Sequence, residues 1–136
     1  MPDAGPLAFG SASSWSPEQL RLLTDALEIE VSAPRLDGGF GRWTPIWTVV
    51  AGTEVFVRTW HRRETGWYGG AVRSGTARIR VGDSPVDVTV ATVGDTDAAA
   101  VDAAYRTKYG EPAARSMVTT EAAASTLRLA PRSPRR

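Results

Sequence analysis

WTPIWTVVAGTEVFVRTW, residues 43–60, predicts the element on which the fold is built. The apolar segments on either side of Gly52-Thr53 have the composition of β-strands, and the glycine suits a two-residue turn. Such a turn places Val49 opposite Phe56. We therefore expect a long hairpin with one face that carries Trp47, Val49, Phe56, Arg58 and Trp60.

A helix is expected before this hairpin. Ser16 suits the N-cap position, Pro17 the first helical position, and Gln19 completes a capping box. Leucines follow at helical spacing, so one face is apolar. The sequence predicts a helix from about residue 17 to residue 27 that packs on a sheet.

A second hairpin is expected after the first. Apolar and polar residues alternate over residues 77–90, which is typical of half-buried strands. A four-residue turn at 82–85 places Arg80 opposite Asp87 on the solvent face. The two side chains then form a surface ion pair of little energetic weight.

A second helix and a final strand complete the pattern. Residues 96–109 predict the helix, which ends at Gly110 and allows Asp102 and Arg106 to pair at i, i+4. Residues 125–130 predict the strand.

These elements predict an α+β, mainly β, fold. About six mostly antiparallel strands with two main helices fit a split β-barrel-like architecture, in which a groove lies where the sheet splits. We expect a flexible N-terminal segment over residues 1–14, one domain over 15–131 and a disordered basic tail over 132–136.

The composition excludes several classes of function. The chain has no cysteine and one histidine, so thiolate chemistry and a conventional zinc site are excluded, and we expect no metal. A net charge of +1 argues against nucleic acid or an anionic membrane as partner. Neither a signal peptide nor a membrane span is recognisable, so we expect a cytoplasmic protein.

RTWHRRETGWY, residues 58–68, is the densest group of candidate binding residues. Indole rings stack on planar ligands, and guanidinium groups pair with phosphate or carboxylate oxygens. We interpret the segment as the lip of a groove for a small planar, anionic ligand. Its candidate residues are Trp47, Arg58, Trp60, Arg62, Arg63 and Trp67. For Arg58, a side chain that merely covers core aromatics is an equal alternative.

Two other classes of function remain open from the residues alone. His61, with Glu64 nearby, suits acid/base catalysis of an isomerisation or cyclisation without a cofactor. Exposed tryptophan, tyrosine and arginine also mark interaction surfaces, so a non-enzymatic ligand or protein interaction module is the third class.

Five segments carry a resemblance to a known family. They are Ile46-Trp47, Val57-Arg58-Thr59, Gly66-Trp67-Tyr68, DAAYRTKYG at 102–110, and TLRL at 126–129 followed by Pro131. The chain resembles the bacterial family called domain of unknown function 2255. That family in turn is similar to split β-barrel proteins that bind flavin mononucleotide (FMN) or a deazaflavin, notably the deazaflavin-dependent nitroreductases.

The resemblance implies a cofactor, a reaction and a homodimer. It makes Arg58, Thr59 and the segment through Trp67 and Tyr68 the rim of a cofactor site. The implied reaction is hydride transfer from a reduced deazaflavin or flavin to a small substrate. Arg58, Arg62 or Arg63 would hold phosphate, Trp60 or Trp67 would pack on the ring system, and Tyr68 would protonate the product. The bulky segment 60–63 and Gly69-Gly70 depart from the family pattern that we expect.

Overall fold

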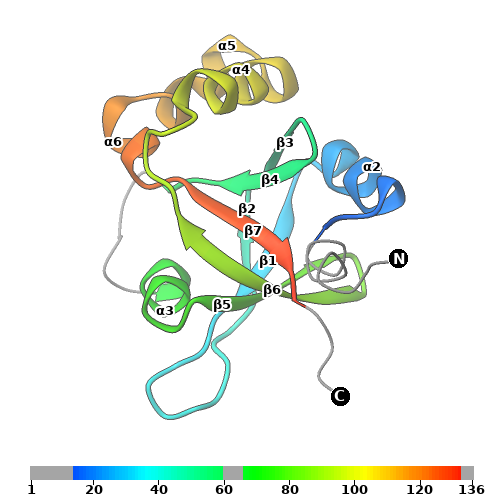
Figure 1. The fold of residues 1–136 in the computed structure, drawn as a ribbon, viewed down its shortest axis with the longest axis vertical. Helices are drawn as coiled ribbons and strands as arrows, with labels where there is room; N and C mark the ends of the chain where they lie inside the picture. Colours follow the sequence, from blue (N-terminus) through cyan, green and yellow to red (C-terminus); the bar gives the residue numbers. More distant parts are fainter. Residues whose placement is uncertain (1–13, 60–65, 133–136) are drawn as a thin grey trace, which may run out of the picture.

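The structure of the protein is a computed structural model, and it describes residues 14–59 and 66–132. Within these ranges, one antiparallel sheet has the strand order β2-β1-β5-β6-β7-β4-β3 (Figure 1). The strands are β1 Ile29–Ser32, β2 Thr44–Ile46, β3 Val49–Ala51, β4 Glu54–Val57, β5 Thr76–Val81, β6 Ser84–Thr92 and β7 Leu127–Pro131. The helices are α2 Pro17–Asp25, α3 Gly66–Ser74, α4 Ala98–Tyr109, α5 Glu111–Ala114, the 3-10 helix η1 Arg115–Met117, and α6 Thr120–Ala124.

The sheet curls into a half-barrel because its two edge strands are almost continuous in sequence. β2 and β3 lie at opposite ends of the strand order, yet only Trp47 and Thr48 separate them. Three trans peptide units span at most about 11 Å, so the two edges of the sheet must approach each other at this link. The split of the barrel therefore lies at the Trp47-Thr48 link.

The first hairpin has the predicted turn and register, but it is shorter than expected. Val49 lies opposite Phe56, as predicted. Residues 44–46 do not continue this hairpin; they form β2, which pairs with β1 instead. Pro45 lacks a backbone N–H and suits such an edge strand.

The core has two parts. The first fills the concave side of the half-barrel and includes Trp15, whose indole Nε1 donates to the Leu129 carbonyl at 2.9 Å. The second lies between the β3–β4 hairpin and α4 and contains Val49, Phe56, Val101, Tyr105, Ala114 and Met117. Four of the five residues expected on one hairpin face can be placed: Val49 and Phe56 in this second core, Trp47 packed against it, and Arg58 beside the Tyr105 ring. That face of the hairpin is therefore covered by α4.

Local signals predicted the helix ends well. α2 begins with the expected capping box, in which Ser16 and Gln19 bond to each other's backbone N–H groups, and it ends at Asp25 rather than near residue 27. α4 begins at Ala98, two residues later than expected, and ends at Tyr109, with Gly110 as its C-cap at a φ of 86°. Glycine adopts this left-handed conformation without the steric cost that a side chain brings.

The sheet has seven strands, in line with the expectation of about six. Two expectations about the elements were wrong. Residues 66–74 form a third substantial helix, α3. The second hairpin turns through Gly82-Asp83 alone, which shifts its register and places Arg78, not Arg80, opposite Asp87.

Two ion pairs were also assigned to wrong partners. Arg78 Nε lies 2.7 Å from Asp87, whereas Arg80 Nε lies 2.7 Å from Glu30 on the neighbouring strand. Asp102 does not pair with Arg106, which lies 3.1 Å from Glu111 instead. The reason is that Asp102 is engaged by a buried cation, as the next subsection describes.

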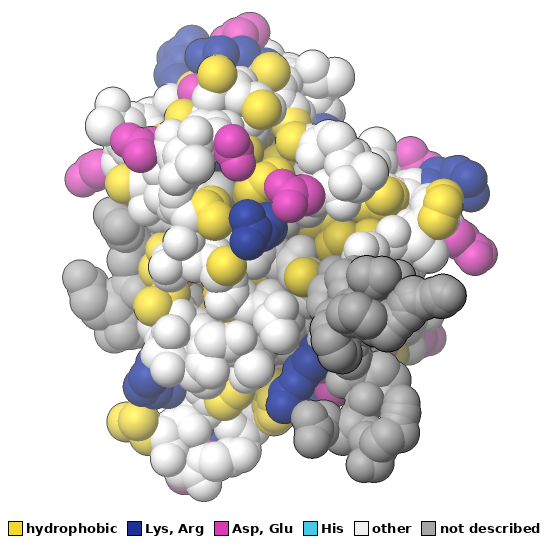
Figure 2. Space-filling view, in the orientation of Figure 1, with side chains coloured by type: hydrophobic (Ala, Val, Ile, Leu, Met, Phe, Trp, Pro, Cys, Tyr) yellow, Lys and Arg dark blue, Asp and Glu magenta, His cyan; other side chains and the backbone are white. Residues whose placement is uncertain are grey.

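The surface carries charges of both signs. On the face shown in Figure 2, basic and acidic side chains are interspersed rather than gathered into a patch of one sign. Within the described residues, no helix is long and apolar enough to cross a membrane.

Candidate functional site

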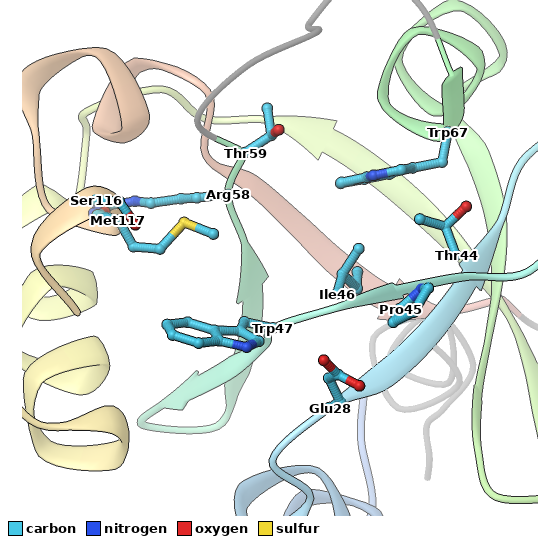
Figure 3. Close-up of a pocket in the computed structure, with 10 residues that line it drawn as sticks. All are labelled: Glu28, Thr44, Pro45, Ile46, Trp47, Arg58, Thr59, Trp67, Ser116 and Met117. Atoms are coloured by element: carbon cyan, nitrogen blue, oxygen red, sulfur yellow. The ribbon is translucent and has the colours of Figure 1, made fainter. Parts of the chain in front are cut away.

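A cavity of about 370 Å³ opens at the split of the half-barrel (Figure 3). Five segments meet there: the residue before β1, β2 with its link to β3, the end of β4, the first turn of α3, and η1. The described lining residues are Glu28, Thr44, Pro45, Ile46, Trp47, Arg58, Thr59, Trp67, Ser116 and Met117. Four of the predicted binding residues, namely Trp47, Arg58, Thr59 and Trp67, therefore border one cavity.

Two indoles border the cavity from different elements. Trp67 lies in the first turn of α3, and Figure 3 shows its ring on the α3 side of the cavity. It contacts Tyr68 edge-on, with 5.5 Å between ring centroids. Trp47 stacks on Tyr109 of α4 at 3.9 Å and an interplanar angle of 6°. Both indoles are only half-buried, so each keeps part of its surface for a ligand.

Arg58 is buried and its charge is neutralised. Its side chain is 0 % exposed, and Nη1 lies 2.5 Å from Asp102 Oδ1. Nη1 also donates to the Met117 carbonyl at 2.7 Å, and Nε donates to the Thr126 hydroxyl at 2.8 Å. The guanidinium lies 5.6 Å from the centre of the Tyr105 ring. Arg58 therefore fastens β4 to α4 and η1, and it presents no exposed edge to an anion.

Two polar atoms in this buried group have no hydrogen-bond partner among the described residues. They are Nη2 of Arg58 and the hydroxyl oxygen of Tyr105. Burial raises the pKa of Tyr105 well above its usual value, so this phenol stays protonated throughout the physiological range.

Ser125 connects the two elements that flank residues 60–65. Its hydroxyl accepts from the Thr59 N–H at 2.9 Å, and its carbonyl accepts from the Tyr68 hydroxyl at 2.8 Å. The ends of β4 and α3 that carry Thr59 and Trp67 are thus fixed to one residue. Tyr68 itself is buried and is not among the described lining residues, so its role as a proton donor stays a prediction.

Sequence reasoning missed several residues of this site. Glu28, Ser116 and Met117 line the cavity, and Asp102 and Ser125 hold its walls. The spacing of Asp102 and Arg106 suggested a helical pair, and no local signal pointed to Arg58, 44 positions away.

Four predicted site residues lie outside the described residues: Trp60, His61, Arg62 and Arg63. Among the described residues, no group of histidine, aspartate and glutamate side chains is arranged to hold a metal ion.

The curled antiparallel half-barrel, with helices beside it and a cavity at its split, defines a split β-barrel protein. Residues 19–129 match the family described as "Uncharacterized protein conserved in bacteria (DUF2255)", and the chain belongs to this family. No curated protein matches the chain.

Solved structures share the fold at low sequence identity. The conserved hypothetical protein Rv2991 from Mycobacterium tuberculosis is 12 % identical with a TM-score of 0.58, over 92 % of this chain and 84 % of that one. HutZ, the heme storage protein from Vibrio cholerae, is 10 % identical with a TM-score of 0.60, over 89 % and 91 %. An F420 reductase is 15 % identical with a TM-score of 0.54, over 85 % and 92 %. These likenesses establish the split-barrel fold.

Proposed function

We propose that this protein binds the planar ring of a deazaflavin or flavin in the cavity at the split and transfers hydride from it to a small substrate. One observation carries the proposal: two half-buried indoles from different elements border a cavity of about 370 Å³. Such a cavity has the size and aromatic lining typical of small-molecule sites. The fold likeness to an F420 reductase, named for a deazaflavin, is consistent with this choice of ligand.

The described residues suit the ring of such a cofactor better than its phosphate. Trp67, Ile46 and Met117 offer apolar and aromatic surface for a ring system. A phosphate needs an available cation, and Arg58 is already paired with Asp102. Arg62 and Arg63 are thus the better candidates for the phosphate, and that assignment stays a prediction for residues outside the described ranges.

The chain's own contribution is to bind and orient. In this proposal, Trp67 packs on the ring, Trp47 limits the other side of the cavity, and Thr59 and Ser116 offer polar groups at its border. The bound cofactor supplies the hydride. Tyr68 acts mainly by holding α3 through the Ser125 carbonyl, which keeps Trp67 in place.

A fluorescence titration tests the proposal. Wild-type protein is titrated with FMN and with a deazaflavin while tryptophan emission is followed, and we expect saturable quenching. Trp67→Ala should weaken binding about tenfold, because stacking of a planar ring on an aromatic side chain contributes about 1–3 kcal/mol. Trp43→Phe is the matched control, since Trp43 packs under Arg80 and does not border the cavity. Absence of quenching by either compound would refute the proposal for these cofactors.

Cofactor-independent acid/base catalysis is the second candidate, and a carboxylate favours it. Glu28 borders the cavity (Figure 3). None of the ion pairs among the described residues includes it. A carboxylate in such a position can accept a proton from a bound metabolite. Turnover of a small aromatic metabolite without added cofactor, abolished in Glu28→Gln, would support this candidate. Full activity of His61→Ala would exclude the histidine version.

A third candidate is an interaction module without catalysis. The expected protein partner of such a module is a second copy of this chain. Light scattering on the purified protein tests directly whether the chain forms a homodimer. A strictly monomeric particle would remove the dimeric version.

A further inference from the structure

The C-terminal end of α4 holds the link at which the barrel splits. Tyr109 stacks on Trp47, the first residue of the link, with 3.9 Å between ring centroids. The Tyr109 hydroxyl lies 2.7 Å from the Leu27 carbonyl and 3.4 Å from the carbonyl of Thr48, the second residue of the link. One side chain therefore contacts both residues between the edge strands.

Lys108 makes a second attachment to the same link. Its Nζ donates to the Thr48 carbonyl at 2.7 Å and to the Leu23 carbonyl of α2 at 2.9 Å. It is also the single lysine of the chain. The last two residues of α4 thus bond to the backbone carbonyls of Leu23 and Leu27, near the end of α2, and to that of Thr48 in the link.

These contacts add to those that bury α4. The helix packs into the second core through Val101 and Tyr105, which are 1 % and 0 % exposed. Lys108 and Tyr109 are only half-buried, and the contacts described above join them to the link and to α2. Tyr109 also packs against the second core and stacks on Tyr105, with 6.1 Å between ring centroids. The end of α4 is therefore attached both to the core and to the link.

We propose that Tyr109 and Lys108 are positioning residues that hold Trp47 as a wall of the cavity and thereby set the shape of ligand that fits. The proposal rests on the function proposed for the cavity. This two-residue link is the direct covalent connection between the two edge strands of the half-barrel. The Thr48 hydroxyl, which donates to the Phe56 carbonyl at 3.1 Å, holds the second residue of the link from the β4 side, and the contacts of Tyr109 hold Trp47 from the α4 side. Moving the Trp47 ring changes the width of the cavity that it borders.

A double-mutant cycle tests the proposal with FMN as the probe. Tyr109→Leu should weaken FMN binding about tenfold in the wild-type background and have almost no effect in a Trp47→Ala background, because it acts through the Trp47 ring. Tyr109→Phe keeps the ring and should bind within about threefold of wild type. Arg106→Met, on the same helix and in an exposed pair with Glu111, is the control and should bind as wild type does. Equal effects of Tyr109→Leu in both backgrounds would overturn the proposal.

A ligand-free readout separates this proposal from the proposed function. Tyr109→Leu should make one additional indole more accessible to acrylamide and change the near-ultraviolet circular dichroism, and both changes should be absent in the Trp47→Ala background. If wild-type protein binds no FMN but these changes occur, the cofactor assignment fails and the positioning role stands. If neither signal changes, Trp47 keeps its place without Tyr109 and the proposal is wrong.

Discussion

Arg58 is the largest fully buried side chain in the described part of the chain, and it carries a charge. Removing a guanidinium from water costs several kcal/mol unless an opposite charge and hydrogen bonds replace the solvent. Here Asp102, Thr126 and the Met117 carbonyl provide those partners. Arg58, which the sequence suggested as an anion-binding residue, is thus held inside the molecule.

The first prediction at this scale concerns the buried ion pair. Asp102→Ala leaves the guanidinium buried without its counter-charge and should lower the free energy of unfolding by about 3–5 kcal/mol. Urea denaturation of the purified variant measures this loss. Arg106→Ala, which breaks only the exposed pair with Glu111, should cost less than about 1 kcal/mol.

An opposite result would restore the interpretation of Arg58 as a ligand-binding residue. It would consist of an Asp102→Ala variant with wild-type stability and of an Arg58→Met variant that loses only ligand binding.

The second prediction concerns Gly70 in α3. A Cβ at this position would lie 2.7 Å from the Pro34 carbonyl oxygen and 3.1 Å from the Ala33 Cβ. Glycine to alanine within a helix normally stabilises by up to about 1 kcal/mol, but this contact with backbone cannot relax cheaply. Gly70→Ala should therefore destabilise by about 1–3 kcal/mol in thermal or urea unfolding.

Val72→Ala is the matched control for that experiment, because Val72 lies in the same helix and is 41 % exposed. It should change stability by no more than about 0.5 kcal/mol. Stabilisation by Gly70→Ala would show that α3 does not pack closely on residues 33–34.

At the scale of elements, local sequence signals were sufficient where one short segment determines the structure. The capping box of α2, the Gly52-Thr53 turn and the Gly110 helix end are such cases. α3 was missed because its sequence contains three glycines, which usually indicate a loop. In the folded chain the helix forms because Gly70 allows it to approach residues 33–34 closely.

Partners distant in sequence explain the other errors. The register of the second hairpin depends on whether its turn has two or four residues. Gly82-Asp83-Ser84-Pro85 suits both lengths; four were predicted, and the structure has two. Among the cavity residues, Trp47, Arg58, Thr59 and Trp67 were proposed from the sequence. Glu28 directly precedes β1 and Ser116 lies within η1, and only the folded chain brings them to the cavity, so no spacing along the sequence marks them.

The third prediction concerns the attachment between α4 and α2. Burial lowers the pKa of Lys108 from 10.5 to about 8, and Asp25 on α2 opposes this shift only in part. Tyr109, also adjacent, has its pKa raised to about 12 by burial and, to a smaller extent, by Glu28. The lowered pKa of Lys108 means that the unfolded chain holds the proton more tightly, so stability should rise as pH increases from about 8.

The measurement is the free energy of unfolding of wild type relative to Lys108→Met from pH 7 to 9.5, below the ordinary tyrosine range. As the pH rises, the free energy of unfolding of wild type should increase relative to that of Lys108→Met. Because Lys108 is the single lysine, its side-chain resonance also reports the pKa directly. A pKa near 10.5 and a flat difference would contradict the arrangement at this helix end.

At the scale of the whole molecule, curvature of the sheet and the position of the cavity have one cause. A two-residue link joins the edge strands, so the sheet must close upon itself there, and Trp47 within the link becomes part of the cavity border. The sequence predicted the class of fold from its hairpins. The location of the cavity depended on which strands become edges, and β2 was predicted as part of a hairpin rather than as an edge.

The most direct test of the account is a nuclear magnetic resonance titration of the indole N–H groups with FMN. The five tryptophans give five such signals, assigned by single substitutions. We predict that the signals of Trp47 and Trp67 shift in a saturable manner, while that of Trp15, which is buried and bonded to the Leu129 carbonyl, stays in place. Saturable binding that leaves Trp47 and Trp67 unshifted would contradict the claim that the cavity at the split is the ligand site.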